Sequence, residues 1–166
     1  DKAQSITQAL QLAETRADVI LITGGLGPTK DDITKQVLAT YFNTELVINE
    51  AALANIKKIF SKVNRPLLQI NIDQALIPAS CTPLPNSRGT APGMLFNRDN
   101  KIHVSMPGVP YEMKAMMEKQ VFPFLEQKLD LPEDIVHQTI TVVDVPESVL
   151  STQIEAIEDH LPSHIK

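Results

Sequence analysis

A short apolar run that ends in glycines constrains the fold of this chain more than any other segment. Residues Val19 to Ile22 are all aliphatic, and Thr23-Gly24-Gly25-Leu26-Gly27-Pro28-Thr29 follows them. A continuous apolar run of this length, closed by glycine, predicts a strand that is buried on both faces of a parallel sheet. We therefore expect a three-layer α/β/α domain with a mostly parallel sheet.

The periodicity of apolar residues predicts the elements around this strand. One antiparallel hairpin is expected from two apolar runs, 93–96 and 101–106, that flank four turn-forming residues. The stretch 64–86 contains several prolines and is expected to be irregular, with a short helix near 70–75. Longer helices are predicted over 5–15, 30–42, 50–63 and 110–128, the last of them kinked or restarted at Pro123.

The pattern changes near residue 131. We expect a strand over 135–143 and a helix over 147–160. This tail is too short to fold alone, so the chain is divided into a nucleotide-binding domain, 1–130, and the start of a small α+β module, 131–166.

Composition excludes several classes of function. The formal charge is −5 and no run of Lys or Arg occurs, which argues against nucleic acid as a partner. A single cysteine, Cys81, excludes an intrachain disulfide. No apolar stretch approaches the roughly 20 residues that span a bilayer, and no signal peptide is present, so we expect a cytoplasmic protein with no membrane partner. The histidines at 103, 137, 160 and 164 lack ligand-like spacing and are expected to be packing or surface residues.

The glycine loop after the first strand is the strongest candidate site. A buried parallel strand would place Thr23 at the carboxyl end of the sheet, where α/β folds bind ligands. Gly24, Gly25 and Gly27 permit close approach of backbone to a ligand, and the start of the next helix would offer free N–H groups to an anion. The loop lacks both the P-loop and the GxGxxG spacing.

Two acidic residues, Asp31 and Asp32, follow this loop, and their negative charges bear on whether a phosphate can bind there. Asp31 and Asp32 would repel a bound phosphate by about 4 kcal/mol at 4 Å and an effective dielectric near 20. A bridging cation removes that conflict, and oxygen ligands favour Mg²⁺ or a similar divalent ion. An alternative stays open, because Thr29 and Asp32 also match a capping box at the start of a helix.

Two further glycine-bearing loops precede or follow the predicted hairpin. Gly89-Thr90-Ala91-Pro92-Gly93 leads into it, and Pro107-Gly108-Val109-Pro110 leaves it and opens a helix. Each loop alone is more typical of a turn than of a site. Pro110 and Glu112 are ordinary residues for the start of a helix.

Four ordered motifs resemble the N-terminal domain of the CinA proteins, a family described as competence/damage-inducible proteins or nicotinamide-nucleotide amidases. The motifs are Thr23 to Asp32, Asn71 with Gln74-Ala75, Asn86 with Gly89 to Gly93, and Pro107 to Glu112. The resemblance extends from about Val19 to Leu125. It implies a fold of the molybdenum-cofactor-biosynthesis type, related to MoaB and MogA.

The resemblance also implies a function: metal-dependent hydrolysis of ADP-ribose to AMP and ribose 5-phosphate. Metal-activated water would attack one phosphorus of the pyrophosphate. Mg²⁺ or a similar divalent cation is the expected cofactor, with K⁺ as a further candidate. The family's deamidation of nicotinamide mononucleotide belongs to a separate C-terminal domain that this chain lacks. The family's opening strand and its Gly-Thr-Glu loop have no counterpart either, so we expect the chain to begin inside the domain.

Roles are carried over only at matching positions. Asp32 would be the metal ligand or the water-activating carboxylate, with Asp31 in support. The expected ligand-binding residues are Thr23, Gly24, Gly25, Gly27, Thr29, Asn86, Gly89, Thr90, Gly93, Pro107 and Gly108.

Two other functions remain open from the sequence. One is binding of molybdopterin with nucleotidyl transfer to a pterin, as in the MogA relatives. The other is a non-catalytic module that binds a nucleotide and assembles the protein, which we expect to be a homodimer.

Overall fold

A computed structural model describes residues 2–129 and 137–162. The chain divides into two compact units, Asp1–Asp130 and Leu131–Lys166. The first unit contains a four-stranded sheet in the order β1-β6-β5-β4 and a two-stranded sheet of β2 and β3. Its strands are β1 (Val19–Thr23), β2 (Leu46–Ile48), β3 (Leu76–Pro78), β4 (Thr82–Leu84), β5 (Gly93–Arg98) and β6 (Lys101–Met106).

Strand direction in the larger sheet follows from the connections. β1 and β6 are parallel, with Val19 opposite Ile102. β5 pairs antiparallel with both β6 and β4. The predicted hairpin is confirmed, and its turn is tighter than expected because Asp99 and Asn100 both adopt positive φ. The parallel pairing expected for the sheet is therefore confined, among the described strands, to β1 and β6.

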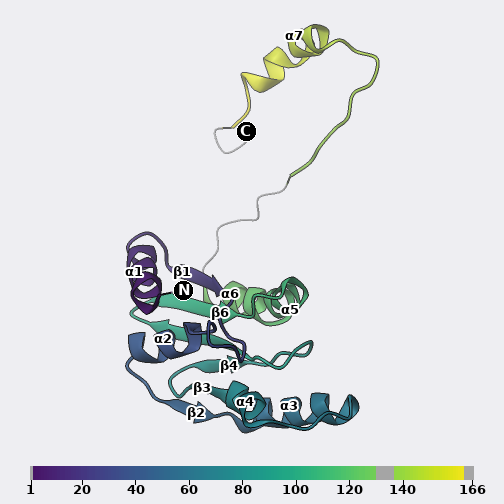
Figure 1. The fold of residues 1–166 in the computed structure, drawn as a ribbon. Helices are drawn as coiled ribbons and strands as arrows, with labels where there is room; N and C mark the ends of the chain where they lie inside the picture. Colours follow the sequence, from purple (N-terminus) through teal and green to yellow (C-terminus); the bar gives the residue numbers. More distant parts are fainter. Residues whose placement is uncertain (1, 130–136, 163–166) are drawn as a thin grey trace. The chain divides into compact units, whose positions relative to one another are not determined.

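Helices cover both faces of this sheet, which gives the expected three-layer α/β domain (Figure 1). One core cluster joins Leu10 of α1 (Ala3–Glu14) and Leu38 of α2 (Thr34–Tyr41) to Met94 and Phe96 of β5. The other joins Leu95 and Val104 to the helical segment after β6. Alternate residues of β5 enter opposite cores, as the pleat requires.

The helical segment after β6 is interrupted, as Pro123 predicted. It consists of α5 (Pro110–Met116), a π-helical turn (Met117–Val121) and α6 (Phe122–Lys128), with the proline in the first turn of α6. Proline lacks the N–H that a continuous helix needs. The change to i→i+5 bonding just before it lets the chain resume as a new helix.

The prediction that β1 is buried on both faces is wrong. Ile20 is buried in the core, but Leu21 keeps 48% of its surface exposed. β1 lies at the end of the strand order, and Leu21 belongs to neither core cluster. On this face of β1, Val19 packs against the cluster formed with the helical segment after β6, but Leu21 does not.

Two other boundaries differ from the sequence prediction. α2 begins at Thr34 rather than at residue 30. The stretch expected to be irregular contains β3 and β4 besides the short helix, which is resolved as α4 (Gln69–Ile72) and a 3₁₀ turn, Asp73–Ala75. α3 (Glu50–Lys62) agrees closely with its predicted range.

The second unit contains α7 (Glu147–Glu158), close to the predicted helix. The predicted strand 135–143 is wrong for residues 137–143, which pair with no other strand; residues 135 and 136 lie outside the described part. None of residues 137–162 is buried. A strand needs a partner for its backbone groups, and the described part of this unit offers none. Over the described residues no helix is long and apolar enough to cross a membrane.

Candidate functional site

The three glycine-bearing loops meet around one cavity at the carboxyl ends of β1 and β6. This cavity, here called the cleft, has a volume of about 330 Å³. Residues 24–28, 90–91 and 107–109 line it, together with Asp32, Gln74 and Glu112. The topology brings them together because parallel β1 and β6 end at the same edge of the sheet.

Two of the loops approach each other closely at a pair of glycines. A Cβ on Gly108 would lie 3.2 Å from the Cα of Gly24, and Gly24 itself adopts a φ of 91°. The Gly24 N–H donates to the Met106 carbonyl at 3.0 Å. This amide ties β1 to β6 and is therefore not free to bind a phosphate, contrary to the expectation for Gly24.

Asp32 is the acidic residue that lines the cleft. Its Oδ2 accepts hydrogen bonds from the Thr29 backbone N–H at 2.9 Å and from the Thr29 hydroxyl at 2.6 Å. Burial acts to raise the pKa of Asp32, but these donors, the Gly27 N–H and the Lys35 charge outweigh it, and the net pKa is lowered. The side chain is therefore a carboxylate at neutral pH.

The capping-box alternative is correct in one contact, because the Asp32 side chain accepts from the Thr29 N–H, but it is wrong that this contact lies at the start of a helix. The two residues close a turn that precedes α2, and the residue before the helix, Ile33, makes no side-chain cap. The Thr34 N–H donates to the Gly25 carbonyl at 3.2 Å. Because the protein's own backbone occupies this first amide, the start of α2 is a poorer anion site than the sequence suggested.

Asp31 does not join Asp32 in the cleft. Its side chain is exposed and lines neither the cleft nor the cavity beside it. Among the described residues no three His, Cys, Asp or Glu side chains are grouped to hold a metal ion. Mg²⁺ often binds through one or two carboxylates together with substrate phosphates and water. A cation bound in that way would have Asp32 as its carboxylate ligand in the cleft.

Glu112 is a cleft residue that sequence reasoning missed. It lies in the first turn of α5, and its Oε2 accepts a hydrogen bond from the Asn86 side chain at 2.7 Å. A Cβ on Gly89 would collide with the same carboxylate. An acidic residue in the first turn of a helix is usually explained by the helix dipole, so the sequence offers no reason to place Glu112 in a site. Its contact with the loop is visible only in the structure, where the carboxylate lies opposite Gly89.

The loop from Asn86 to Ala91 is held by side chains from other elements. Asn86 is buried and also donates to the Ala91 carbonyl at 2.9 Å, while Asn55 of α3 donates to the carbonyls of Asn86 and Gly89. The Thr90 hydroxyl donates to the Gln74 side chain at 2.5 Å. These bonds make Asn86 a residue that positions the loop.

Five of the predicted ligand-binding residues do not line the cleft: Thr23, Thr29, Asn86, Gly89 and Gly93. Gly93 is buried at the start of β5, where a Cβ would collide with the sulfur of Met116. It is a packing residue, because only glycine fits between the strand and α5. Thr23 ends β1 opposite Met106 and does not line the cleft.

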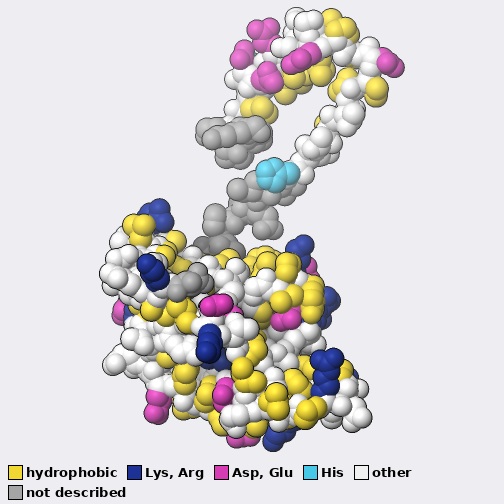
Figure 2. Space-filling model, in the orientation of Figure 1, with side chains coloured by type: hydrophobic (Ala, Val, Ile, Leu, Met, Phe, Trp, Pro, Cys, Tyr) yellow, Lys and Arg dark blue, Asp and Glu magenta, His cyan; other side chains and the backbone are white. Residues whose placement is uncertain are grey.

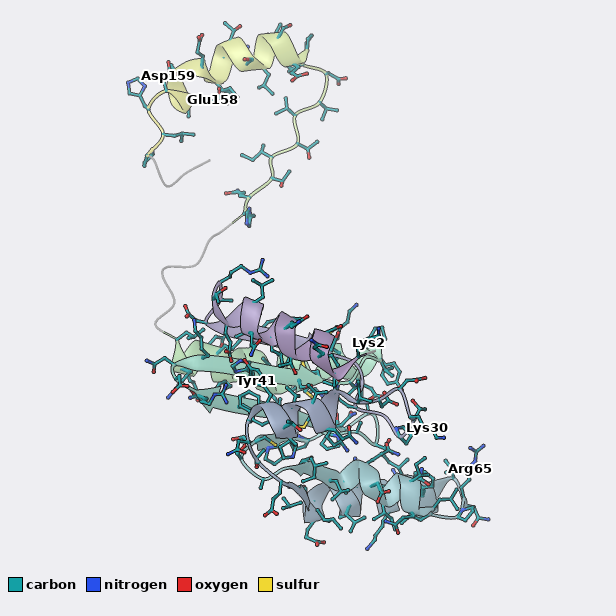
Figure 3. All side chains as sticks on the ribbon, turned by 60° about the vertical axis from the view of Figure 1, so that its left-hand side comes forward. Lys2, Lys30, Tyr41, Arg65, Glu158 and Asp159 are labelled. Atoms are coloured by element: carbon teal, nitrogen blue, oxygen red, sulfur yellow. The ribbon has the colours of Figure 1, made fainter. Side chains whose placement is uncertain are left out.

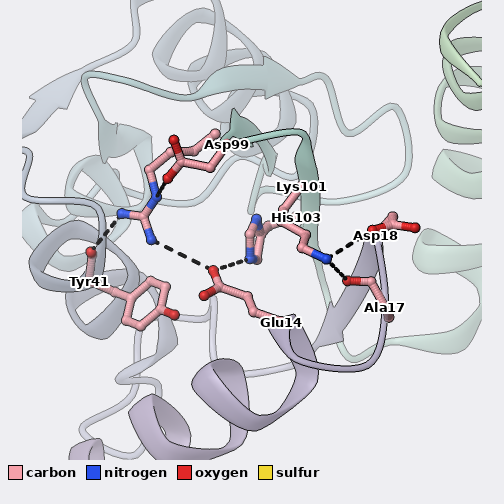
Figure 4. Close-up of polar contacts among 8 residues, drawn as sticks. Glu14, Ala17, Asp18, Tyr41, Asp99, Lys101 and His103 are labelled. Carbon is pink, nitrogen blue, oxygen red and sulfur yellow. Dashed lines mark hydrogen bonds and ion pairs between the residues drawn. The ribbon is translucent and has the colours of Figure 1, made fainter.

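A second polar cluster lies toward the opposite end of the sheet (Figure 4). His103 is fully buried in β6, and its Nε2 lies 2.8 Å from the Glu14 carboxylate. Arg98 lies 3.6 Å from the same carboxylate and stacks over Phe42. This confirms His103 as a packing residue; His137 and His160 are exposed, and His164 lies outside the described residues.

Comparisons with known proteins agree with this architecture. The family model described as "Probable molybdopterin binding domain" matches residues 1–127. A CinA-like protein from Flavobacterium psychrophilum is 49% identical over 167 residues, and a competence-damage inducible protein from Clostridium beijerinckii is 41% identical over 159. The chain belongs to the CinA family. These alignments cover 100% and 96% of this chain but 40% and 38% of the relatives, so the chain spans about two fifths of their length.

A solved structure gives the same result for the fold. The protein CinA from Thermoplasma acidophilum, described as of unknown function, is 36% identical to this chain. It matches with a TM-score of 0.63 over 76% of this chain and 71% of that one. The first unit is therefore a CinA-type domain with a mixed α/β fold.

Proposed function

We propose that the CinA-type domain binds a nucleotide sugar diphosphate such as ADP-ribose in the cleft and, with a divalent cation, hydrolyses its diphosphate bridge. The observation that carries this proposal is the meeting of three glycine-bearing loops and the Asp32 carboxylate around one cavity. A concave site with few convergent polar groups is the usual form of a small-ligand site.

The cleft residues have distinct tasks in this reaction. Backbone around Gly25 and Gly27 lies against the phosphates, where a side chain would hold the ligand away. Thr29 keeps Asp32 ionised and oriented through two hydrogen bonds to one of its oxygens. The Asp32 carboxylate, which the Gly27 N–H also approaches, would orient water or hold a cation. Asn86 and Glu112 fix the 89–91 loop on the opposite wall.

A cation is required by the charges of the cleft. Asp32 and Glu112 both line it, so a diphosphate would meet two carboxylates. A bound Mg²⁺ would neutralise the phosphoryl oxygens and so make phosphorus easier to attack. K⁺ is a further candidate for the same charge balance.

Replacement of Asp32 by Asn tests the proposed reaction. Asn keeps the size and one acceptor for Thr29 but loses the charge, so we expect AMP release from ADP-ribose with Mg²⁺ to fall by about 100-fold or more. Asp31→Asn is the matched control, because it removes the same charge one residue away from the cleft, and it should remain within about twofold of the original rate. Equal rates for Asp32→Asn and the original chain, or equal losses in both variants, would show that the proposal is wrong.

A second candidate function is binding of a pterin such as molybdopterin, which the description of the matching family favours. Calorimetry with a pterin phosphate and with ADP-ribose separates the two proposals. Tighter binding of the pterin would make it the preferred ligand. ADP-ribose binding with Mg²⁺ but no product would instead support the non-catalytic module, for which a homodimer in solution is the expected assembly.

A further inference from the structure

A second cavity adjoins the cleft at Asp32. It has a volume of about 160 Å³ and shares Gly27, Pro28, Asp32 and Gln74 with the cleft, so the two cavities have a common wall. Its other walls include Thr29, Lys35 and Asp73. A space of this size suits a small group, such as a phosphate, better than a nucleoside.

Lys35 is the unusual residue of this second cavity. Only 7% of its surface is exposed, and its Nζ donates to the Asp73 and Gln74 carbonyls, each at 3.3 Å. An ammonium group carries three N–H donors, so one donor remains for the cavity that the side chain lines. Burial lowers its pKa to about 8, against the opposing effect of the Asp73 and Asp32 carboxylates. The group therefore keeps its charge at neutral pH.

This buried charge lacks a close counter-charge. Within residues 2–129 and 137–162 no carboxylate lies within 4.0 Å of the Lys35 ammonium. A buried charge without an ionic partner is costly to folding. Its two long hydrogen bonds to neutral carbonyls compensate for that cost only in part.

The charges around the two cavities indicate a role for Lys35 in binding an anion. Three acidic side chains line them, those of Asp32, Asp73 and Glu112, and Lys35 is the only Lys or Arg among the described lining residues. Along the walls of the two cavities, a diphosphate ligand therefore meets a surplus of negative charge except beside Lys35.

We propose that Lys35 receives the second anionic group of the ligand in the cavity beyond Asp32, so that the site selects diphosphates over monophosphates. The inference rests on the proposed function for the location of the ligand, but not on hydrolysis. One phosphate lies in the cleft against the glycine loops, and the other reaches past Asp32 to the remaining Lys35 donor. Lys35 is thus a residue that positions the ligand and determines its class.

The alternative is a purely structural role, in which Lys35 only ties α2 to the 3₁₀ turn at Asp73. The test compares Lys35→Met, which keeps the length of the side chain without its charge, with Lys35→Arg, which keeps the charge. Lys30→Met is the matched control, because Lys30 is exposed in the loop between β1 and α2, and its side chain points away from the domain (Figure 3).

The probes are the α,β-methylene analogue of ADP-ribose, which cannot be hydrolysed at its bridge, and AMP, each titrated by calorimetry into the full chain with Mg²⁺. We expect Lys35→Met to lose tenfold or more in affinity for the analogue but less than threefold for AMP. Lys35→Arg should recover part of the loss, and Lys30→Met should bind both probes like the original chain.

Three results would overturn the inference. One is unchanged binding of the analogue to Lys35→Met, and another is an equal loss for both probes, which a structural role produces. If the original chain does not bind the analogue, inorganic diphosphate replaces it, and failure to bind that probe also overturns the inference. Lys35-dependent binding without product would leave the inference intact and remove only the hydrolysis proposed above.

Discussion

At the scale of single residues, His103 shows how burial sets the acid stability of this fold. Burial lowers the pKa of His103 although Glu14 acts to raise it, and Arg98 and Lys101 act with burial. In the unfolded chain a histidine titrates near a pKa of about 6.5. Below that pH the unfolded state takes up a proton that the folded state resists, so the free energy of unfolding falls as the pH falls.

Replacement of His103 by Gln tests this coupling. Urea unfolding at pH 7.5 and 5.5 should show a smaller loss of stability on acidification in the His103→Gln variant than in the original chain. The measured quantity is the difference between the two pH values, so a general loss of stability in the variant does not affect it. His160→Gln, which alters an exposed histidine, should keep the original pH dependence. If the pH dependence of unfolding in His103→Gln equalled that of the original chain, His103 would not be the source of the acid sensitivity.

At the scale of elements, the turn between β1 and α2 depends on two glycines in different ways. Gly24 and Gly25 both have positive φ, 91° and 70°. A Cβ on Gly24 would meet nothing within 4 Å, whereas one on Gly25 would collide with the Thr34 side chain at the start of α2. A side chain would therefore have space at position 24 but not at position 25, although both residues have a positive φ.

Alanine substitutions separate conformational strain from collision. A left-handed backbone costs a non-glycine residue about 1–2 kcal/mol, so Gly24→Ala should lose about that much free energy of unfolding. Gly25→Ala should lose more, because Thr34 must also move. Urea unfolding of both variants gives the comparison, and equal losses would mean that the collision is relieved at no cost.

At the scale of the whole molecule, the described part of the second unit contains no buried residue. None of residues 137–162 is buried, and α7 has no core residue. The first unit holds both core clusters. On the face shown in Figure 2, Lys and Arg side chains form separate groups and not one basic patch, in agreement with the absence of a basic run in the sequence.

Removal of the second unit should therefore leave the first unit folded. We expect a chain of residues 1–130 to unfold at the same temperature as the full chain, followed by circular dichroism, and to bind the ADP-ribose analogue with the same affinity. A midpoint lower by several degrees would show that residues after 130 contribute to the stability of the first unit.

The sequence by itself determined the α/β class, the hairpin and the interruption at Pro123, because these depend on local patterns of apolar residues, turn formers and proline. Its motifs also indicated the three loops that line the cleft. Asp32 and the glycines of the first loop could be selected from the sequence alone because a short, ordered motif contains them.

Only the tertiary structure decided which residues share the cleft. Asp31 and Asp32 are neighbours in the sequence, yet a turn directs one to the solvent and the other to the cavity. Gly93 belongs to a loop motif but packs against Met116, and Lys35 and Glu112 look like ordinary helical residues until the fold places them beside a cavity. Burial and proximity across long sequence separations create these environments, and no local pattern records them.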